Sequence, residues 1–198
     1  QRGQQGAARE LAPPRQPPDP TLPTHEDRPW VLITLGTSFG NDPNFFVAAS
    51  HAAQRLGCLP ILALGNQITG EALAALQSKL PTTAIVRNYV NFQAVLPYCA
   101  AAIHHGGAGT THALVTSGVP QIVVPHAADQ QRQAQGVMRS NVGLAFAPKD
   151  VTIDLLEDGL AAILPDRSDW RTAAHHLCEE FAALGGVVRA ADYVCELV

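Results

Sequence analysis

Short apolar runs alternate with longer mixed segments along this chain from residue 30 onward. Apolar runs without a polar break are typical of strands buried on both faces of a parallel sheet. The segments between them have the spacing and capping residues of helices. Strands are predicted at residues 30–35, 59–64, 84–87, 100–103, 121–124 and 144–146. Helices are predicted at residues 43–56, 70–79, 110–117, 129–140, 152–164 and 168–197, the last with a break at Gly185-Gly186.

This alternation favours an α/β fold, a Rossmann-like doubly wound parallel sheet. Residues 30–198 are expected to form one domain with a substantial core. The composition agrees, since 46% of the residues are apolar and 15% are charged. Open sheets of this class bind ligands at the carboxyl ends of their strands, so the loops that follow the strands are where chemistry is expected.

Residues 1–29 have a different composition and hold seven of the fifteen prolines. Almost no large apolar side chains occur there, so the segment cannot bury enough surface to fold. We predict a flexible Pro-rich linker or tail. Because the sequence begins at Gln1 rather than at methionine, we interpret this segment as the connector of a longer protein.

The net charge of −4 and the isoelectric point near 6.0 argue against nucleic acid and acidic membrane surfaces as partners. No apolar run approaches the roughly 20 residues of a membrane span, and no secretory signal is present, so a cytoplasmic location is expected. The cysteines lack the spacing of metal ligands and are expected to be buried thiols. They are Cys58, Cys99, Cys178 and Cys195.

A glycine-rich turn between a predicted strand and a predicted helix is the main candidate for ligand binding. Gly106, Gly107 and Gly109 remove three Cβ atoms where the chain turns, which lets the backbone approach a ligand closely. Thr110 and Thr111 then open a helix whose first N–H groups can hold a phosphate. The turn is neither the Gly-x-Gly-x-x-Gly dinucleotide motif nor a Walker loop, since both motifs are missing from the chain.

Polar residues that suit a sugar diphosphate lie beside this turn. His105 directly precedes the glycines, and Asp129-Gln130 follows the next strand, so both are expected at the same edge of the sheet. A carboxylate and an amide offer complementary acceptors and donors to sugar hydroxyls. Alternatively, His105 is a core histidine and Asp129 is a helix N-cap. His104 is expected to be structural, because adjacent strand residues point to opposite faces.

These motifs resemble a known signature. His-Gly-Gly-x-Gly-Thr from His105, then Gly-Val-Pro from Gly118, then Pro-x-x-x-Asp-Gln from Pro125, resemble the donor-binding signature of GT-B nucleotide-sugar glycosyltransferases. The version found here is similar to that of bacterial natural-product enzymes of the glycopeptide and macrolide type. The resemblance covers roughly residues 30–198 and implies a nucleotide-sugar donor-binding domain, the carboxyl-terminal half of such an enzyme.

The resemblance also implies roles for individual residues. The diphosphate is expected to contact His105, Gly107, Ala108, Gly109 and Thr110, together with Thr37 and Ser38 after the first strand. The base and ribose are expected at Tyr89, Val90 and Phe92, and the sugar at Asp129, Gln130 and His126. Phe92 stands where many relatives have a glutamine for the ribose. Alternatively, Thr37 and Ser38 cap the next helix, and Tyr89 packs against its neighbours.

The implied function is donor binding in an inverting glycosyltransferase that uses a UDP- or TDP-sugar and a small-molecule acceptor hydroxyl. No catalytic residue, cofactor or metal is expected in this chain. The Asp-x-Asp motif of metal-dependent relatives does not occur, and the base is expected in a missing amino-terminal acceptor domain. This chain alone should therefore bind donor and transfer nothing. The alternatives are a natural donor-binding subunit that works with a partner acceptor subunit, and one half of a nucleotide-sugar epimerase.

Overall fold

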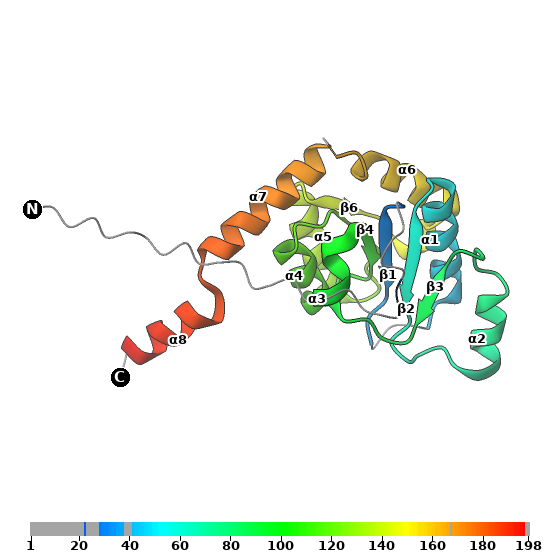
Figure 1. Ribbon diagram of the computed structural model, residues 1–198, viewed down its shortest axis with the longest axis horizontal. Coiled ribbons are helices and arrows are strands. Elements are labelled where there is room, and N and C mark those ends of the chain that lie inside the picture. The colour runs from blue at the N-terminus through cyan, green and yellow to red at the C-terminus, as the bar shows by residue number, and fades with distance from the viewer. Residues whose placement is uncertain (1–21, 23–27, 38–40, 167, 197–198) are drawn as a thin grey trace, which may run out of the picture.

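The computed structural model describes residues 22, 28–37, 41–166 and 168–196. Within these residues, six parallel strands form one sheet in the order β3-β2-β1-β4-β5-β6 (Figure 1). The strands are β1 (Trp30–Thr34), β2 (Leu59–Ala63), β3 (Ile85–Arg87), β4 (Cys99–His104), β5 (Gln121–Val123) and β6 (Gly143–Ala145). Each predicted strand is present with its ends shifted by one residue or less, and the doubly wound α/β fold is confirmed.

Helices connect the strands and continue to the end of the described chain. They are α1 (Pro43–Arg55), α2 (Gly70–Gln77), α3 (Phe92–Val95), α4 (Ala108–Thr116), α5 (Ala128–Arg139), α6 (Ile153–Ile163), α7 (Asp169–Ala183) and α8 (Gly186–Glu196). Short α3 and the 3₁₀ turns Leu96–Tyr98 and Pro148–Asp150 were not predicted, because four or fewer residues show no helical period. The predicted break between α7 and α8 is confirmed, with positive φ at Gly185 and Gly186.

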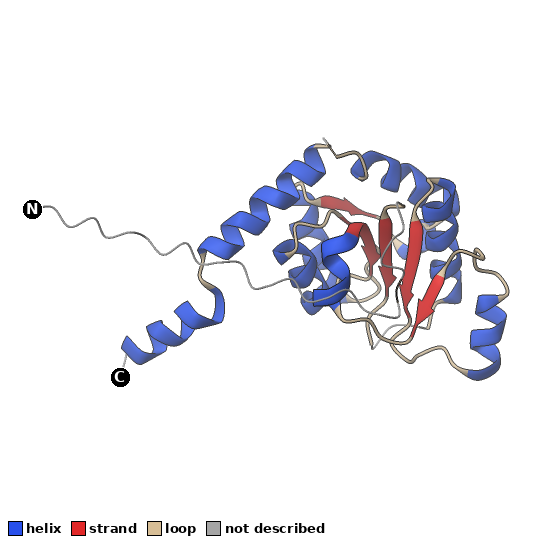
Figure 2. Cartoon of the chain, in the orientation of Figure 1, coloured by secondary structure: helices blue, strands red, loops and turns tan. Residues whose placement is uncertain are grey.

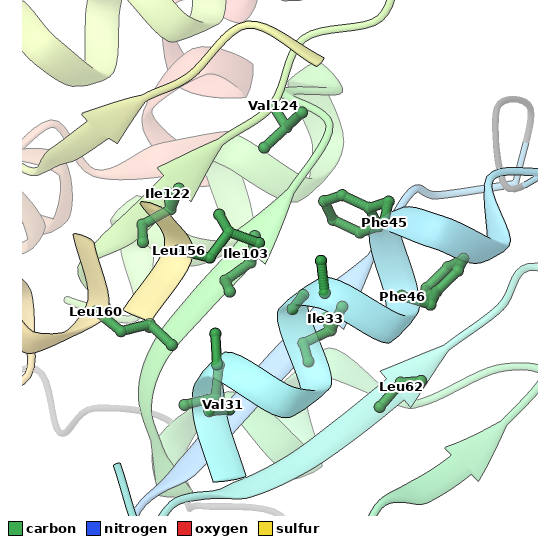
Figure 3. Close-up of a cluster of buried hydrophobic side chains, with 14 of the residues drawn as sticks. Val31, Ile33, Phe45, Phe46, Leu62, Ile103, Ile122, Val124, Leu156 and Leu160 are labelled. Carbon is green, nitrogen blue, oxygen red and sulfur yellow. The ribbon is translucent and has the colours of Figure 1, made fainter. Parts of the chain in front are cut away.

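Helices cover both faces of the sheet, as Figure 2 shows. On one face, Val31 and Ile33 of β1 pack with α1 and with Leu156 of α6 (Figure 3). On the other face, Leu32 packs in a cluster with Leu114 of α4. Successive strand residues point to opposite faces, and both faces of the central strands are buried, so these strands are apolar over most of their length. This burial explains the unbroken apolar runs in the sequence.

The strand order places a crevice at the centre of the sheet. The chain runs outward from β1 to β2 and β3, then returns beside β1 as β4 and continues to β5 and β6. The loops after β1 and β4 therefore leave the same edge in opposite directions. Ligands of doubly wound sheets bind at this switch point.

The two ends of the described chain differ in how they relate to the core. Leu22, inside the predicted linker, is buried in the same cluster as Trp30, whereas most of residues 1–29 lie outside the described residues, and the linker stays a prediction. Helix α8 points away from the sheet and exposes Val188, Tyr193 and Val194 (Figure 1). Among the described residues, no helix is both long and apolar enough to cross a membrane.

Candidate functional site

A pocket of about 440 Å³ opens at the carboxyl ends of the central strands, at the switch point of the sheet. Its walls come from the loops after β1, β2, β3 and β4 and from the start of α5. The structure therefore brings together residues from four separate loops and the first turn of α5. Those predicted from the sequence and found in the lining are Thr37, Tyr89, Val90, Phe92, His105, Gly107, Ala108, Gly109, Thr110, Asp129 and Gln130.

The amino-terminal end of α4 forms one wall of this pocket. Gly107 is the N-cap and supplies no side-chain hydrogen bond. The N–H groups of Ala108, Gly109 and Thr110 have no hydrogen-bond partner within the described part of the chain. Unpaired donors at the positive end of a helix dipole favour an anion. This wall, formed by residues 107–110, has the chemistry of a phosphate site, and we call it the phosphate wall.

His105 lies between two glycines at the base of the same wall. A Cβ atom on Gly36 would be 2.7 Å from its ring, and one on Gly107 would be 2.5 Å away. Burial, and then the nearby His126, lower the pKa of His105, so the imidazole is neutral near pH 7. Its Nδ1 atom is buried without a hydrogen-bond partner among the described residues. A neutral imidazole keeps one N–H to donate to an anion.

His104 faces the opposite side of β4 and is fully buried. Its Nε2 atom is 2.8 Å from Oε1 of Gln121, and its Nδ1 atom accepts a hydrogen bond from the N–H of Gly106 at 3.1 Å. Burial lowers the pKa of His104 to about 3. The structure thus supports the expectation that His104 is structural, since it is buried, neutral and not among the residues that line the pocket.

The loop after β1 lies close against the loop after β2. Thr34 donates its hydroxyl proton to the carbonyl of Ala63 at 2.9 Å and accepts from the N–H of Gly36 at 3.1 Å. A Cβ atom on Gly65 would lie 2.0 Å from the Gly36 carbonyl oxygen, so only glycine permits this approach. Thr34, Gly65 and Asn88 were not predicted as lining residues. The carboxyl ends of the first, second and third strands could have indicated them.

Thr37 lines the pocket, whereas Ser38 lies outside the described residues. The alternative role of Thr37 as the cap of the next helix is wrong, because α1 begins only at Pro43. Its N-cap is Asp42, whose Oδ1 atom accepts from the N–H of Phe45 at 3.1 Å. The Thr37 hydroxyl is therefore not engaged as the cap of this helix.

At the other end of the pocket, Tyr89 is 74% exposed and Val90 is buried. The alternative that Tyr89 packs against its neighbours is wrong, since an exposed ring has no such packing. Phe92 is half-buried at the start of α3. An exposed aromatic ring beside apolar Val90 and Phe92 forms a surface on which a planar ring can stack.

Asp129 and Gln130 lie in the first turn of α5, beside the wall formed by the start of α4. Gln130 is buried, and its Oε1 atom accepts hydrogen bonds from the N–H groups of His126 at 2.7 Å and Ala127 at 3.0 Å. The alternative that Asp129 is the N-cap is wrong, because Ala127 is the N-cap and Gln130 makes the capping bonds. The exposed Asp129 carboxylate is left facing the pocket. The oxygen of the Gln130 amide is thus engaged with backbone, so this side chain offers the pocket its NH₂ group.

His126, predicted to contact the sugar, is not among the residues that line the pocket. Its Nδ1 atom donates to the carbonyl of Val124 at 2.8 Å, and its Nε2 atom is 3.6 Å from Oδ2 of Asp42. The ring also packs edge-on against Phe45. The packing of the loop after β5 against α1 holds the side chain beside the pocket, and its sugar contact stays a prediction that this geometry does not favour.

The described pocket lining contains no lysine or arginine side chain. No group of three or more potential ligands in the described chain could hold a metal ion. Cys58 and Cys99 are buried as expected, and burial raises the pKa of Cys99 to about 12. The expectation of burial is wrong for Cys178, which is half-buried, and for Cys195, which is exposed, because α7 and α8 lie at the surface.

The fold and the pocket together define a doubly wound α/β domain that presents a helix N-terminus, a neutral histidine and a carboxylate–amide pair to one cavity. The family model described as "Erythromycin biosynthesis protein CIII-like, C-terminal domain" matches residues 67–192. The chain therefore belongs to this family. The resemblance to bacterial natural-product glycosyltransferases is confirmed.

Two curated relatives show the same relationship. Elloramycin glycosyltransferase ElmGT of Streptomyces olivaceus is 33% identical over 162 residues, which cover 79% of this chain and 38% of the relative. Oleandomycin glycosyltransferase of Streptomyces antibioticus is 29% identical over 168 residues, which cover 83% of this chain and 37% of the relative. The chain thus spans about two fifths of the length of these relatives.

Solved structures confirm the fold. The calicheamicin glycosyltransferase CalG4 matches with a TM-score of 0.77 and 25% identity, over 87% of this chain and 44% of that protein. The glycosyltransferase VinC, solved in complex with DTDP, matches with a TM-score of 0.66 and 27% identity, over 84% of this chain and 42% of that protein.

Proposed function

We propose that this chain is the donor-binding domain of a natural-product glycosyltransferase and that its pocket binds a UDP- or TDP-sugar. The observation that carries the proposal is the placement of two chemistries in one cavity. Three unpaired N–H groups at the start of α4 face the same cavity as the Asp129 carboxylate. The first suits a diphosphate and the second suits a polyhydroxyl sugar.

The diphosphate binds at the phosphate wall. The N–H groups of Ala108, Gly109 and Thr110 donate to its oxygens, and neutral His105 donates one further hydrogen bond. The pocket lining has no lysine or arginine side chain among the described residues, so the helix dipole supplies the positive potential. Thr37, and Ser38 beside it in the sequence, are proposed to add hydroxyl contacts.

The base binds at the opposite end, where it stacks on the exposed ring of Tyr89 and pairs with the backbone of Val90. Phe92 packs beside the ribose. The sugar extends toward α5, where Asp129 accepts from one hydroxyl and the NH₂ group of Gln130 donates to another oxygen. This division follows from the capping bonds that engage the Gln130 amide oxygen.

The proposed reaction of the whole protein is inversion at the anomeric carbon. An acceptor hydroxyl attacks that carbon, a base outside this chain takes its proton, and the nucleoside diphosphate leaves with the bonding pair. The phosphate wall stabilises the charge that develops on the leaving diphosphate. Proton removal by a positioned base is typically worth about 10²–10⁴ in rate, so the chain alone binds donor without transferring it.

Calorimetry with UDP, TDP, GDP and ADP tests donor binding. UDP or TDP should bind, and His105→Ala should weaken that affinity by about 1.5–3 kcal/mol, the scale of one hydrogen bond to a charged group. Thr116→Ala is the matched control, because this exposed hydroxyl lies at the far end of the same helix and bonds only to helix carbonyls. Equal affinity in folded His105→Ala and wild-type protein would refute the role of His105.

A transfer assay tests the second part of the proposal. The purified 198-residue chain should give no glycosylated product with TDP- or UDP-glucose and a panel of phenol and macrolide acceptors. Activity should appear when an acceptor domain is supplied on a second polypeptide. Product formation by the chain alone would show that the base lies within it.

A further inference from the structure

The buried pair of His104 and Gln121 lies on the side of β4 that faces away from the pocket. Both residues have no exposed surface, and they join β4 to β5 through the contact of 2.8 Å between their side chains. The pair also reaches the phosphate wall, because the N–H of Gly106 donates to Nδ1 of His104. A polar link thus runs from β5 through the imidazole to the turn before α4.

The hydrogen bonds fix the proton on this imidazole. Since the Gly106 N–H donates to Nδ1, that atom holds a lone pair and the ring proton is on Nε2. Nε2 then donates to the Gln121 amide, which must present its oxygen. The Nε2 atom of Gln121 is left buried without a hydrogen-bond partner among the described residues, an arrangement that costs stability.

The bond from Gly106 back to His104 encloses the backbone of His105. It therefore restricts the direction in which the His105 side chain leaves the strand. Gly106 has a φ of +85°, and a Cβ atom there would lie 2.8 Å from Val123 of β5. The turn is therefore restrained on one side by its close approach to Val123 and on the other by the hydrogen bond from Gly106 to the His104 ring. The result is the placement of the His105 ring between Gly36 and Gly107.

We propose that His104 is a positioning residue for nucleoside diphosphate binding, which holds the Gly106 turn around His105 through the Nε2–H tautomer that Gln121 fixes. The inference rests on the proposed function of the pocket. Burial keeps His104 neutral across the physiological range, with a pKa of about 3, so the bond persists wherever the protein is folded near neutral pH.

Two substitutions separate the effects of the two hydrogen bonds that the His104 ring makes, one at Nδ1 and one at Nε2. His104→Asn puts an oxygen at the place of Nδ1, so the bond from Gly106 is kept while the bond to Gln121 is lost. His104→Gln puts an amide at the place of Nε2, so the bond to Gln121 is kept while the acceptor for Gly106 is lost. The shorter asparagine also leaves a cavity, so His104→Asn should unfold at the lower temperature.

The affinities for TDP and UDP should rank in the opposite order, with His104→Gln binding more weakly than His104→Asn. We expect His104→Gln to bind about five- to tenfold more weakly than wild type, the effect of losing one ordinary hydrogen bond. His104→Asn should stay within about threefold of wild type despite its lower melting temperature. A residue that only supports the fold would leave the affinity of the folded protein unchanged in both variants. His104→Gln that is folded and binds with wild-type affinity therefore overturns the proposal.

Nitrogen-15 NMR of the histidine rings gives a second test that needs no variant. We expect His104 to show the Nε2–H tautomer from pH 8 to pH 5, and the Nδ1–H tautomer or the protonated ring would overturn the proposal. If wild-type protein binds neither TDP nor UDP, the proposed function fails instead, whatever the tautomer is. The two failures are therefore distinguishable.

Discussion

Substituting Gly107 with alanine should displace the His105 ring without straining the backbone. Gly107 has a φ of −62° and a ψ of 139°, which any L-residue can adopt. The added Cβ atom would lie 2.5 Å from Nε2 of His105 and 2.8 Å from its Cε1 atom. The ring has little room to retreat, because it lies against Gly36 on another side.

The size of the effect follows from the contact that is lost. A hydrogen bond to a charged group is worth about 1.5–3 kcal/mol, which corresponds to roughly 10- to 150-fold in affinity for a nucleoside diphosphate. Gly107→Ala should therefore weaken TDP or UDP binding by about as much as His105→Ala does. Isothermal calorimetry measures both.

The double variant gives the decisive comparison. Once His105 is alanine, the methyl group on residue 107 has no ring to displace, so His105→Ala/Gly107→Ala should bind within about threefold of His105→Ala. If Gly107→Ala lowers the affinity by the same factor with and without His105, the methyl group blocks the ligand directly, and displacement of the His105 ring is refuted as the cause.

Gly57→Ala is the control for an effect on folding stability alone. It has a φ of +73° with nothing within 4 Å of the added atom, and it should cost about 1–2 kcal/mol of folding free energy at unchanged affinity.

Three further predictions follow from other contacts. Asp129→Ala should lower calorimetric affinity for TDP-glucose but hardly change affinity for TDP, and a parallel loss would contradict the sugar contact. The ordinary pKa of His104, 6.5, falls to about 3 on folding, so its contribution to stability is complete above pH 6.5 and is lost as pH falls toward 3. Urea unfolding should detect a loss of about 2 kcal/mol between pH 6.5 and 5 that is missing in His104→Asn. Leu156→Ala, in the core between α6 and the sheet, should cost about 2–5 kcal/mol in the same assay, and a loss below 1 kcal/mol would show that the site collapses.

The alternation of strands and helices was readable from the sequence because both faces of the sheet are buried. Each central strand is then apolar over most of its length, which leaves a local pattern in the sequence. The phosphate turn was equally readable. Gly106 and Gly107 follow a strand and precede a helix, and the unpaired N–H groups of a helix start depend on neighbouring residues only.

The roles of other side chains were decided by contacts between distant loops. The helix caps are an exception, because they are local contacts. The sequence allowed Asp129 or Thr37 to be a cap, but Gln130 and Asp42 make those bonds to backbone groups three or four residues away. His126 lies on the same edge as the pocket, yet its ring is taken up by the loop contacts with α1.

The position of His105 shows the same division. The sequence placed it at a strand end beside the glycines, and so identified it as a candidate for anion binding. Its place between Gly107 and Gly36, which is far away in sequence, depends on the pairing of β1 with β4. The sequence by itself therefore determined which residues stand at the sheet edge, since strand length and turn chemistry are local. Only the tertiary structure decided which of them share a cavity, because that depends on the order in which the strands pair.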